Sequence, residues 1–404
     1  MKENLLYLVH RIPFPPNKGD KIRSFNWLKG LSKEFNIYLG TYIDSPEDEQ
    51  YLDELKKYCA EVFVLKLNPM IAKIKSLQGI IFGQALSLPY YANNEMQSWV
   101  TKCVQRNNIK KALVFSSPMA QFVEGDLFQH MLRIMDFVDI DSDKWKQYAE
   151  AKSGLMRWLY TREAKTLFEY ERKLSQLFDS SLFVSSKEAE MFRSLVKQPG
   201  VIIDYVNNGV DFDYFSSEHD FNNPYTKEES VLVFTGAMDY WANVDAVVWF
   251  ASEIFPQLKS HYKNTKFYIV GSKPTTDVLK LEEIDGVIVT GRVEDVRPYI
   301  HYASVVIAPM RIARGIQNKV LEGMAMAKPC IVSDQGLEGI AAVPGEDLLV
   351  ANSSQEWMSQ LSNIIENMSK AEIGSNARAF VVKKFSWENN VNRLIDFLKA
   401  NKNE

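Results

Sequence analysis

Short β-rich segments alternate with helical patterns along the whole chain, and this series restarts halfway. In the first half, the segments rich in β-branched and aromatic residues are 4–10, 36–43, 61–67, 111–117, 131–138 and 181–186. The second series comprises 231–236, 266–271, 286–291, 304–310 and 329–333. Strands that alternate with helices predict parallel sheets covered on both faces. We therefore expect an α/β protein with two Rossmann-like, doubly wound domains facing each other across a cleft.

A polar stretch rich in turn residues separates the two series and is the predicted linker, 208–230. The predicted domains are 1–207 and 231–385, and we expect a final helix within 386–404 to pack back toward the first domain. At 404 residues the chain is too long for one typical core, which agrees with two domains.

Charge, cysteine count and apolar runs argue against a nucleic-acid-binding, disulfide-stabilised or membrane-spanning protein. The chain has 47 Lys and Arg against 51 Asp and Glu, a net charge of −4, which argues against nucleic acid as a partner. Its three cysteines are widely spaced and odd in number, so they predict a reducing compartment without a disulfide framework. The apolar run at the N-terminus is too short for a signal peptide, and the longest apolar stretch, 80–92, is below spanning length. We expect a cytoplasmic location, with peripheral membrane contact as an open alternative.

The stretch RGIQNKVLEG, which follows segment 304–310, combines a glycine loop with a helix start. A helix N-terminus attracts phosphate, and Gly315 lets the backbone come close to it. Lys319 in the first turn adds a cation for the same anion. Glu322, one turn later on the same face, can accept hydrogen bonds from a ribose diol. This arrangement favours a nucleotide-diphosphate site, and the alternative is a solvated pair of side chains three residues apart.

These residues belong to an ordered series of motifs that resembles retaining glycosyltransferases of the GT-B fold, in the large family four (glycosyl transferases group 1). The motifs are DYVNNGVDFDYF, VFTGAMDYWANVDAVVWF, VTGRVEDVRPYIHYASVVIAPM, NKVLEGMAMAKPCIVSDQGLEGI and VKKFSWENNVNRLIDFL. The first half, through HRIPFPPNKGDKIRSFNWLKGLS, MDFVDIDSDKWKQYA and YTREAKTLFEYERKL, is most similar to sugar transferases associated with exosortase/PEP-CTERM exopolysaccharide systems. The resemblance implies transfer of a sugar from a nucleotide-diphosphate sugar to a saccharide or lipid-linked saccharide acceptor. It assigns the acceptor to the first domain and the donor to the second.

The resemblance also implies the residues of the donor site. Cations and N–H dipoles must stabilise the charge that develops on the leaving phosphate, a role for Lys319 and the helix start, while Glu322 binds hydroxyls. The residues expected to contact the donor are Gly19, Gly236, Arg292, Val293, Arg311, Arg314, Gly315, Ile316, Gln317 and Asn318. Among them, Gly19 would approach the diphosphate from the first domain, with an ordinary turn as the alternative. Arg292 and Val293 fall where the family holds the nucleobase.

One position departs from the family pattern of two glutamates separated by seven residues. Glu322 matches the second glutamate, whereas Arg314 occupies the first position. We expect Arg314, together with Arg311, to neutralise the diphosphate or to contact an acidic sugar. The same departure motivates an alternative function, a non-catalytic subunit of glycan assembly.

On the acceptor side, the segment MDFVDIDSDKW contains Asp136, Asp139 and Asp141 among its four aspartates, and Asp139 is the expected catalytic residue. Its carboxylate would orient the acceptor hydroxyl or take its proton. The Asp-x-Asp pattern looks like the metal site of GT-A transferases, but the second α/β half argues against that fold. The five histidines form no cluster, so we predict neither a metal nor a cofactor. His10 would end the first strand near the cleft, either supporting the site or, as is more common, as a structural residue.

Two further alternatives concern the reaction and the location. A GT-B-type nucleotide-sugar epimerase would share the fold without needing an acceptor. Segments 67–91 and 154–176 mix aromatic residues with Lys and Arg, as segments at an anionic lipid interface do. The other interpretation of both segments is amphipathic helices that pack on the first sheet.

Overall fold

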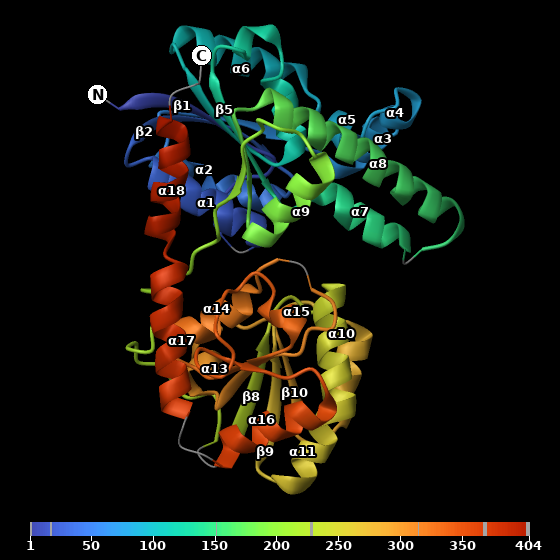
Figure 1. The fold of residues 1–404 in the computed structure, drawn as a ribbon, viewed down its shortest axis with the longest axis vertical. Helices are drawn as coiled ribbons and strands as arrows, with labels where there is room; N and C mark the ends of the chain where they lie inside the picture. The colour runs from blue at the N-terminus through green and yellow to red at the C-terminus, as the bar shows by residue number, and fades with distance from the viewer. Residues whose placement is uncertain are drawn as a thin grey trace. The chain divides into compact units, whose positions relative to one another are not determined.

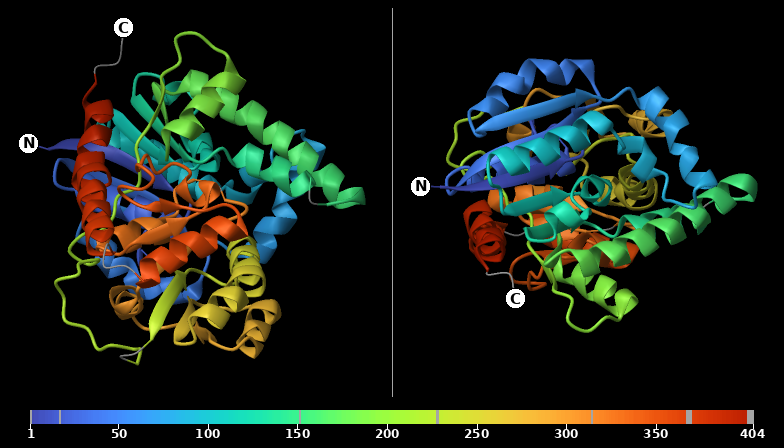
Figure 2. Two further views of the ribbon diagram at one scale, coloured as in Figure 1. Left: turned by 60° about the horizontal axis from the view of Figure 1, so that its bottom comes forward. Right: turned by 90° about the horizontal axis from the view of Figure 1, so that it is seen from above.

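The computed structural model describes residues 2–16, 18–150, 152–226, 229–313, 315–366 and 370–400. The chain forms two compact units, Met1–Asn208 with Glu388–Glu404, and Gly209–Trp387 (Figures 1 and 2). In each unit, helices lie on both faces of a parallel sheet, as the alternating pattern predicts. The predicted α/β class with two doubly wound domains is confirmed.

The first unit contains a seven-stranded sheet in the order β3-β2-β1-β4-β5-β6-β7, with every pair parallel. Its strands are β1 (Glu3–Val9), β2 (Phe35–Ile43), β3 (Glu61–Lys66), β4 (Lys111–Phe115), β5 (Leu132–Val138), β6 (Ser180–Phe183) and β7 (Ile203–Tyr205). Only the three-residue β7 is absent from the predicted segments. The strand order reverses between β1 and β4, and ligands of doubly wound sheets bind at the carboxyl ends of such strands. We call the carboxyl ends of β1 and β4 the first switch point.

Helices of the first unit connect these strands. They are α1 (Gly19–Leu31), η1 (Pro46–Tyr51), α2 (Leu52–Lys56), α3 (Pro69–Ser76), α4 (Gln78–Ile81), α5 (Ser87–Tyr91), α6 (Asn94–Arg106), η2 (Ser117–Phe122), η3 (Asp126–Phe128), α7 (Asp141–Glu150), α8 (Gly154–Leu177) and α9 (Ser186–Val196). The last helix of the chain, α18 (Trp387–Lys399), also packs here. Its Val391 lies against Gly30 of α1, where a Cβ would come within 2.5 Å of the valine Cγ2. Arg393 Nη2 donates to Asp204 Oδ1 at 2.8 Å.

The second unit contains a six-stranded parallel sheet in the order β10-β9-β8-β11-β12-β13. Its strands are β8 (Ser230–Thr235), β9 (Thr265–Val270), β10 (Val287–Gly291), β11 (Val305–Ala308), β12 (Cys330–Val332) and β13 (Leu349–Val350). Five of them overlap the predicted segments, and the two-residue β13 does not. Here the order reverses between β8 and β11, whose carboxyl ends form the second switch point.

The helices of the second unit follow the same alternation. They are α10 (Trp241–Trp249), the π-helical η4 (Phe250–Ile254), α11 (Phe255–His261), α12 (Thr276–Leu279), η5 (Lys280–Glu283), α13 (Arg297–Tyr302), α14 (Asn318–Ala325), α15 (Asp334–Leu337), α16 (Ser354–Glu366) and α17 (Lys370–Lys384). The described part of the predicted linker, from Gly209 onward, belongs to this unit. Within it, Tyr225 is buried and its hydroxyl donates to the carbonyl of Tyr299 at 2.7 Å.

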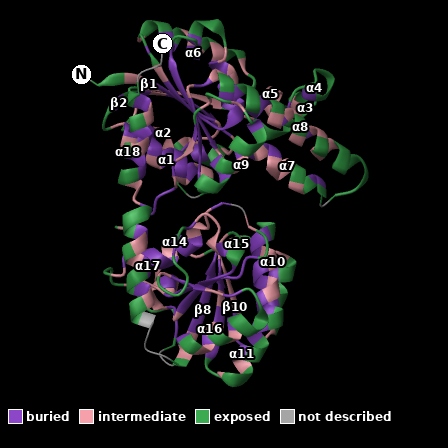
Figure 3. Ribbon diagram, in the orientation of Figure 1, coloured by how far each residue is buried: buried purple, intermediate pink, exposed green. Residues whose placement is uncertain are grey.

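Each unit has its own hydrophobic core, and the strands are the most buried elements (Figure 3). The first unit also buries an ion pair, in which Arg23 of α1 donates from Nε and Nη2 to both carboxylate oxygens of Asp136 in β5, at 2.9 and 3.0 Å. The indole of Trp27 donates to the same carboxylate. Nη1 of Arg23 donates to the carbonyl of Val206, so this pair fixes the segment through which the chain leaves the unit.

Candidate functional site

The second switch point brings together the two loops that the sequence assigns to the donor. β8 pairs directly with β11, so the loop after Thr235 and the loop after Ala308 leave neighbouring strands at one edge of the sheet. α10 follows the first loop and α14 follows the second. Gly236 and segment 315–318 therefore lie where doubly wound sheets bind ligands.

Lys319, in the first turn of α14, connects the two loops. Its Nζ donates to Oδ1 of Asn243 in α10 at 2.9 Å, and Nδ2 of Asn243 donates to the carbonyl of Ala237 at 2.9 Å. Nζ also lies 4.7 Å from the centre of the Phe234 ring. Burial lowers the pKa of Lys319 to about 8. The ammonium is thus fixed by neutral groups, and its charge is available to an anion.

Glu322 lies one turn after Lys319 in α14 and is partly buried. Burial raises the pKa of its carboxyl to about 7, and the charge of Lys319 opposes that shift. Lys319 and Glu322 therefore interact electrostatically. Because neither side chain is fully solvated, the alternative of a solvated pair three residues apart does not describe them. Hydroxyl groups of a ribose are ordinary donors to such a carboxylate.

Glycines let the backbone come close at this edge. A Cβ on Gly271, just after β9, would come within 1.6 Å of the Gly236 carbonyl oxygen, so no larger residue fits there. A Cβ on Gly236 would lie 2.7 Å from Asn243 Nδ2, which would disturb the contact that positions Lys319. Gly315 has a φ of +66°, a left-handed conformation that favours glycine and turns the loop into α14. The sequence analysis did not select Asn243 or Gly271, although Gly271 follows a predicted strand.

The other predicted donor residues lie around this centre. Arg311 is exposed and forms a two-pronged ion pair with Asp245 of α10, so a carboxylate already occupies its guanidinium. Arg292 is exposed and Val293 partly buried in the loop after β10, two strands away from β8, or about 10 Å along the sheet. Ile316 packs against the core, and Gln317 donates to the carbonyl of Gly315. Arg314 lies outside the described residues.

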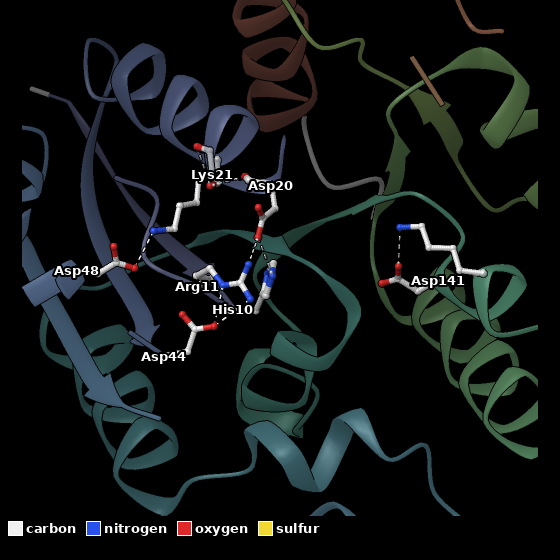
Figure 4. A network of polar contacts seen from close by, with 9 residues as sticks. His10, Arg11, Asp20, Lys21, Asp44, Asp48 and Asp141 are labelled. Atoms are coloured by element: carbon white, nitrogen blue, oxygen red, sulfur yellow. Dashed lines mark hydrogen bonds and ion pairs between the residues drawn. The ribbon is translucent and has the colours of Figure 1, made fainter. Parts of the chain in front are cut away.

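The first switch point holds a network of charged side chains that the sequence analysis missed (Figure 4). Arg11, just after β1, donates to Asp20 and to Asp44 at 3.0 Å each, and His10 Nε2 lies 3.5 Å from Asp20. Although burial opposes it, His10 and Arg11 lower the pKa of the Asp20 carboxyl. Gly19 is the first residue of α1, and a Cβ there would meet open space. Residues that follow β1 and residues that begin α1 share one sheet edge, which is the signal that could have identified this network.

Asp139, the predicted acceptor-side carboxylate, follows β5 and is engaged in an ion pair. Lys144 donates to Asp139 at 2.9 Å and to Asp141 at 3.0 Å (Figure 4 draws the contact with Asp141). Although burial opposes it, these two carboxylates raise the pKa of Lys144. Asp136 of the same segment is enclosed with Arg23. Asp136, Asp139 and Asp141 therefore have internal cationic partners.

Comparison with known proteins finds a family model that matches this part of the chain. The model of the family "Glycosyl transferases group 1" matches residues 229–367, the part of the chain that contains the second switch point. This segment is a glycosyltransferase domain. The match covers both loops and α14, the elements that position Lys319. It supports the expected enzyme class, glycosyltransferase.

Relatives of the glycosyltransferase domain extend over more of the chain. The lipopolysaccharide 1,2-N-acetylglucosaminetransferase of Salmonella typhimurium is 23% identical over an alignment of 250 residues that covers 55% of this chain. The chain spans 62% of the length of that relative.

Solved structures resemble both units together. Sucrose-phosphate synthase from Thermosynechococcus elongatus has a TM-score of 0.72 at 16% identity, over 98% of both chains. Anabaena HepE in complex with UDP-glucose has a TM-score of 0.66 at 13% identity, over 98% of this chain and 99% of that one. These likenesses assign the GT-B fold. Within the described ranges, no helix is both long and apolar enough to cross a bilayer.

Proposed function

We propose that this protein is a retaining glycosyltransferase that moves a sugar from a nucleotide-diphosphate sugar to a saccharide or lipid-linked saccharide acceptor. The observation that supports it most is Lys319, a buried cation held by Asn243 at the second switch point with no carboxylate bonded to it in the described residues. Such a cation beside a helix N-terminus is suited to a diphosphate. The match of residues 229–367 to the glycosyltransferase family supports the same reaction.

In the proposed reaction, the bond between the sugar and the diphosphate breaks and negative charge grows on the leaving phosphate. Lys319 and the free N–H groups at the start of α14 stabilise that charge. Glu322 accepts hydrogen bonds from donor hydroxyls, and the loop with Arg292 and Val293 lies against the nucleobase. Attack from the face of the departing phosphate retains the configuration of the sugar without a covalent intermediate. The reaction requires neither metal nor cofactor.

On the acceptor side, Asp139 orients the attacking hydroxyl in this proposal. Its contact with Lys144 restricts the orientation of the carboxylate. Asp20, held by His10 and Arg11, is another carboxylate at this edge. We expect Asp139→Asn to lower kcat roughly a hundredfold with little change in the KM of the donor. An unchanged kcat in Asp139→Asn together with a large loss in Asp20→Asn would transfer the role to Asp20.

We further propose a place in exopolysaccharide or other cell-surface glycan synthesis, at the cytoplasmic face of the membrane. Two resemblances support this context: the first half of the chain resembles sugar transferases associated with exosortase/PEP-CTERM systems, and the Salmonella relative is a lipopolysaccharide transferase.

A screen of nucleotide sugars tests the proposal directly. Thermal shift and calorimetry with the diphosphates of uridine, guanosine and adenosine, and with their sugars, should show stabilisation by one nucleotide series. Lys319→Ala should weaken that binding at least roughly tenfold, because charge-assisted hydrogen bonds to phosphate are lost. Lys280→Ala, which removes an exposed lysine of the same unit, is the matched control. Absence of binding by every compound would contradict the proposal, and an epimerised nucleotide sugar formed without acceptor would assign epimerase chemistry instead.

A further inference from the structure

Helices α3 and α4 of the first unit turn a row of large apolar side chains toward solvent. Met70, Ile74, Ile81 and Phe82 are 74%, 66%, 79% and 71% exposed. In these two helices only Ala72 and Gly79 are buried. The sequence-based alternative, an amphipathic helix packed on the sheet, does not hold for α3 and α4, whose large apolar side chains are exposed. It does hold for α8, which buries Leu167 and Leu174. The full set of exposed apolar residues is Met70, Ile71, Ile74, Leu77, Ile80, Ile81 and Phe82, which we call the α3–α4 surface.

The α3–α4 surface has the spacing of one helix face. Residues 70, 71, 74, 77 and 81 recur at intervals of three or four, as an apolar stripe on a helix does. The stripe has a defined beginning, because Asn68 caps α3 by accepting from the N–H groups of Met70 and Ile71. Pro69 at the first helical position strengthens this start. Met70, Ile71 and Ile74 of the stripe thus lie in α3, and Ile81 lies in α4.

A second exposed apolar group lies at the start of α8. Leu155 and Trp158 are 76% and 54% exposed, and Met156 is also exposed. Figure 1 shows α3, α4 and α5 beside α8, and polar contacts join this region to α8. Arg162 of α8 donates to the carbonyls of Gly79 and Gln84 at 2.5 and 2.9 Å, and the carboxylate of Glu163 accepts from the N–H of Leu86. The two apolar groups are therefore held in a fixed relation within one unit.

The charge of this region differs from that of the whole chain. Segment 67–94 contains no Asp or Glu, and its Lys73 and Lys75 are exposed. Lys152 and Arg157 are exposed beside the apolar residues of α8. The region is thus locally cationic in a chain whose net charge is −4. Large apolar groups among cations are typical of surfaces that enter the headgroup region of anionic lipids.

We propose that the α3–α4 surface and the start of α8 dock on an anionic lipid bilayer. A second copy of the chain fits less well, because a symmetric contact would place the lysines of one surface against those of the other. Apolar side chains enter the acyl boundary while the lysines remain among the headgroups. Delivery of a lipid-linked acceptor to the first unit rests on the proposed function, whereas docking itself does not.

Vesicle co-sedimentation of the full chain tests this proposal. Vesicles of phosphatidylglycerol and phosphatidylcholine should bind the protein, and pure phosphatidylcholine vesicles should bind it much less. Ile81→Ser/Phe82→Ser should weaken binding at least about tenfold through lost apolar burial. Lys73→Ala/Lys75→Ala should weaken it about fivefold per lysine, with the difference disappearing at high salt.

The matched control is Leu195→Ser/Ile202→Ser, which removes two exposed apolar residues of the same unit outside the docking surface and should bind as the unchanged protein does. All variants should keep the same circular dichroism and the same nucleotide thermal shift, so a failure of the proposed function is recognised separately. Three results would overturn docking: no binding to anionic vesicles, equal binding to neutral ones, or equal losses in the control. A dimer in sedimentation velocity that only Ile81→Ser/Phe82→Ser abolishes would assign the surface to a second copy instead.

Discussion

The two switch points have the same topology but opposite electrostatic designs. At the first, Arg11 contacts the carboxylates of Asp20 and Asp44, so the cation is neutralised within the protein (Figure 4). At the second, the hydrogen-bond partners of Lys319 are the amide oxygens of Asn243 and Gln317. A charge that is already paired stabilises the fold, whereas a charge held by neutral dipoles can still bind a ligand. We therefore expect substitutions of charged residues to affect stability in the first unit and ligand binding in the second.

The largest effect should come from the buried pair of the first unit. Asp136→Asn leaves the guanidinium of Arg23 buried without its carboxylate, which should cost about 3–5 kcal/mol of unfolding free energy. Urea denaturation measures the loss, and the folded fraction should bind the nucleotide as before. Asp53→Asn, at a carboxylate that is 90% exposed, is the control and should leave the denaturation midpoint unchanged. If Asp136→Asn lowered the nucleotide affinity without lowering the stability, the comparison between the two units would be contradicted.

Lys319→Met should show the reverse pattern. Removing the cation should lower kcat/KM for the donor about a hundredfold, the typical cost of losing one group that stabilises the charge of the transition state. Stability should not fall, because the substitution removes a buried charge and keeps an aliphatic side chain. Initial rates and thermal unfolding of the same preparation give both quantities. A different result would be a loss of stability in Lys319→Met with normal activity per folded molecule. Lys319 would then be a structural residue, and the proposed difference between the two switch points would be wrong.

The pH dependence of binding sharpens this assignment. Burial lowers the pKa of Lys319 to about 8, so the free protein loses this charge as the pH rises through 8. Donor affinity should then fall by up to about tenfold per pH unit above 8, and calorimetry should show no such decline in Lys319→Met. The stability of the free protein should change in the other direction. Because the unfolded chain holds the proton up to the ordinary value of 10.5, stability should rise with pH between 8 and 10.5.

Much of the fold was predictable from the sequence because strand segments buried on both faces have a strong local signal. Runs such as 112–115 and 305–308 are continuous and apolar, whereas β7 and β13 are too short to give a pattern. The glycine loop and Lys319 were predictable for a similar reason, since they follow a strand and begin a helix.

The partners of these residues were not predictable, because they depend on contacts between distant segments. Asn243 meets Lys319 across 76 positions, and Asp136 meets Arg23 across 113. The network of Arg11, Asp20 and Asp44 likewise forms only when β1 and β2 pair side by side. The exposed face of α3 shows the same limit, because periodicity identifies an apolar stripe but not what covers it.

The smallest expected effect concerns Arg311, where the second unit resembles the first. Its guanidinium pairs with Asp245 at an exposed position, so the pair itself should contribute no more than about 1 kcal/mol. Asp245→Asn would free the guanidinium of Arg311 in the loop between β11 and α14. Donor binding should then tighten roughly threefold at low salt, since an additional unpaired cation attracts the diphosphate. Arg311→Ala should weaken binding by a similar factor, and the double variant should match Arg311→Ala. Equal tightening in Asp245→Asn and in the double variant would contradict this prediction. It would show that the Asp245 carboxylate repels the donor directly and that the guanidinium of Arg311 does not contribute to donor affinity.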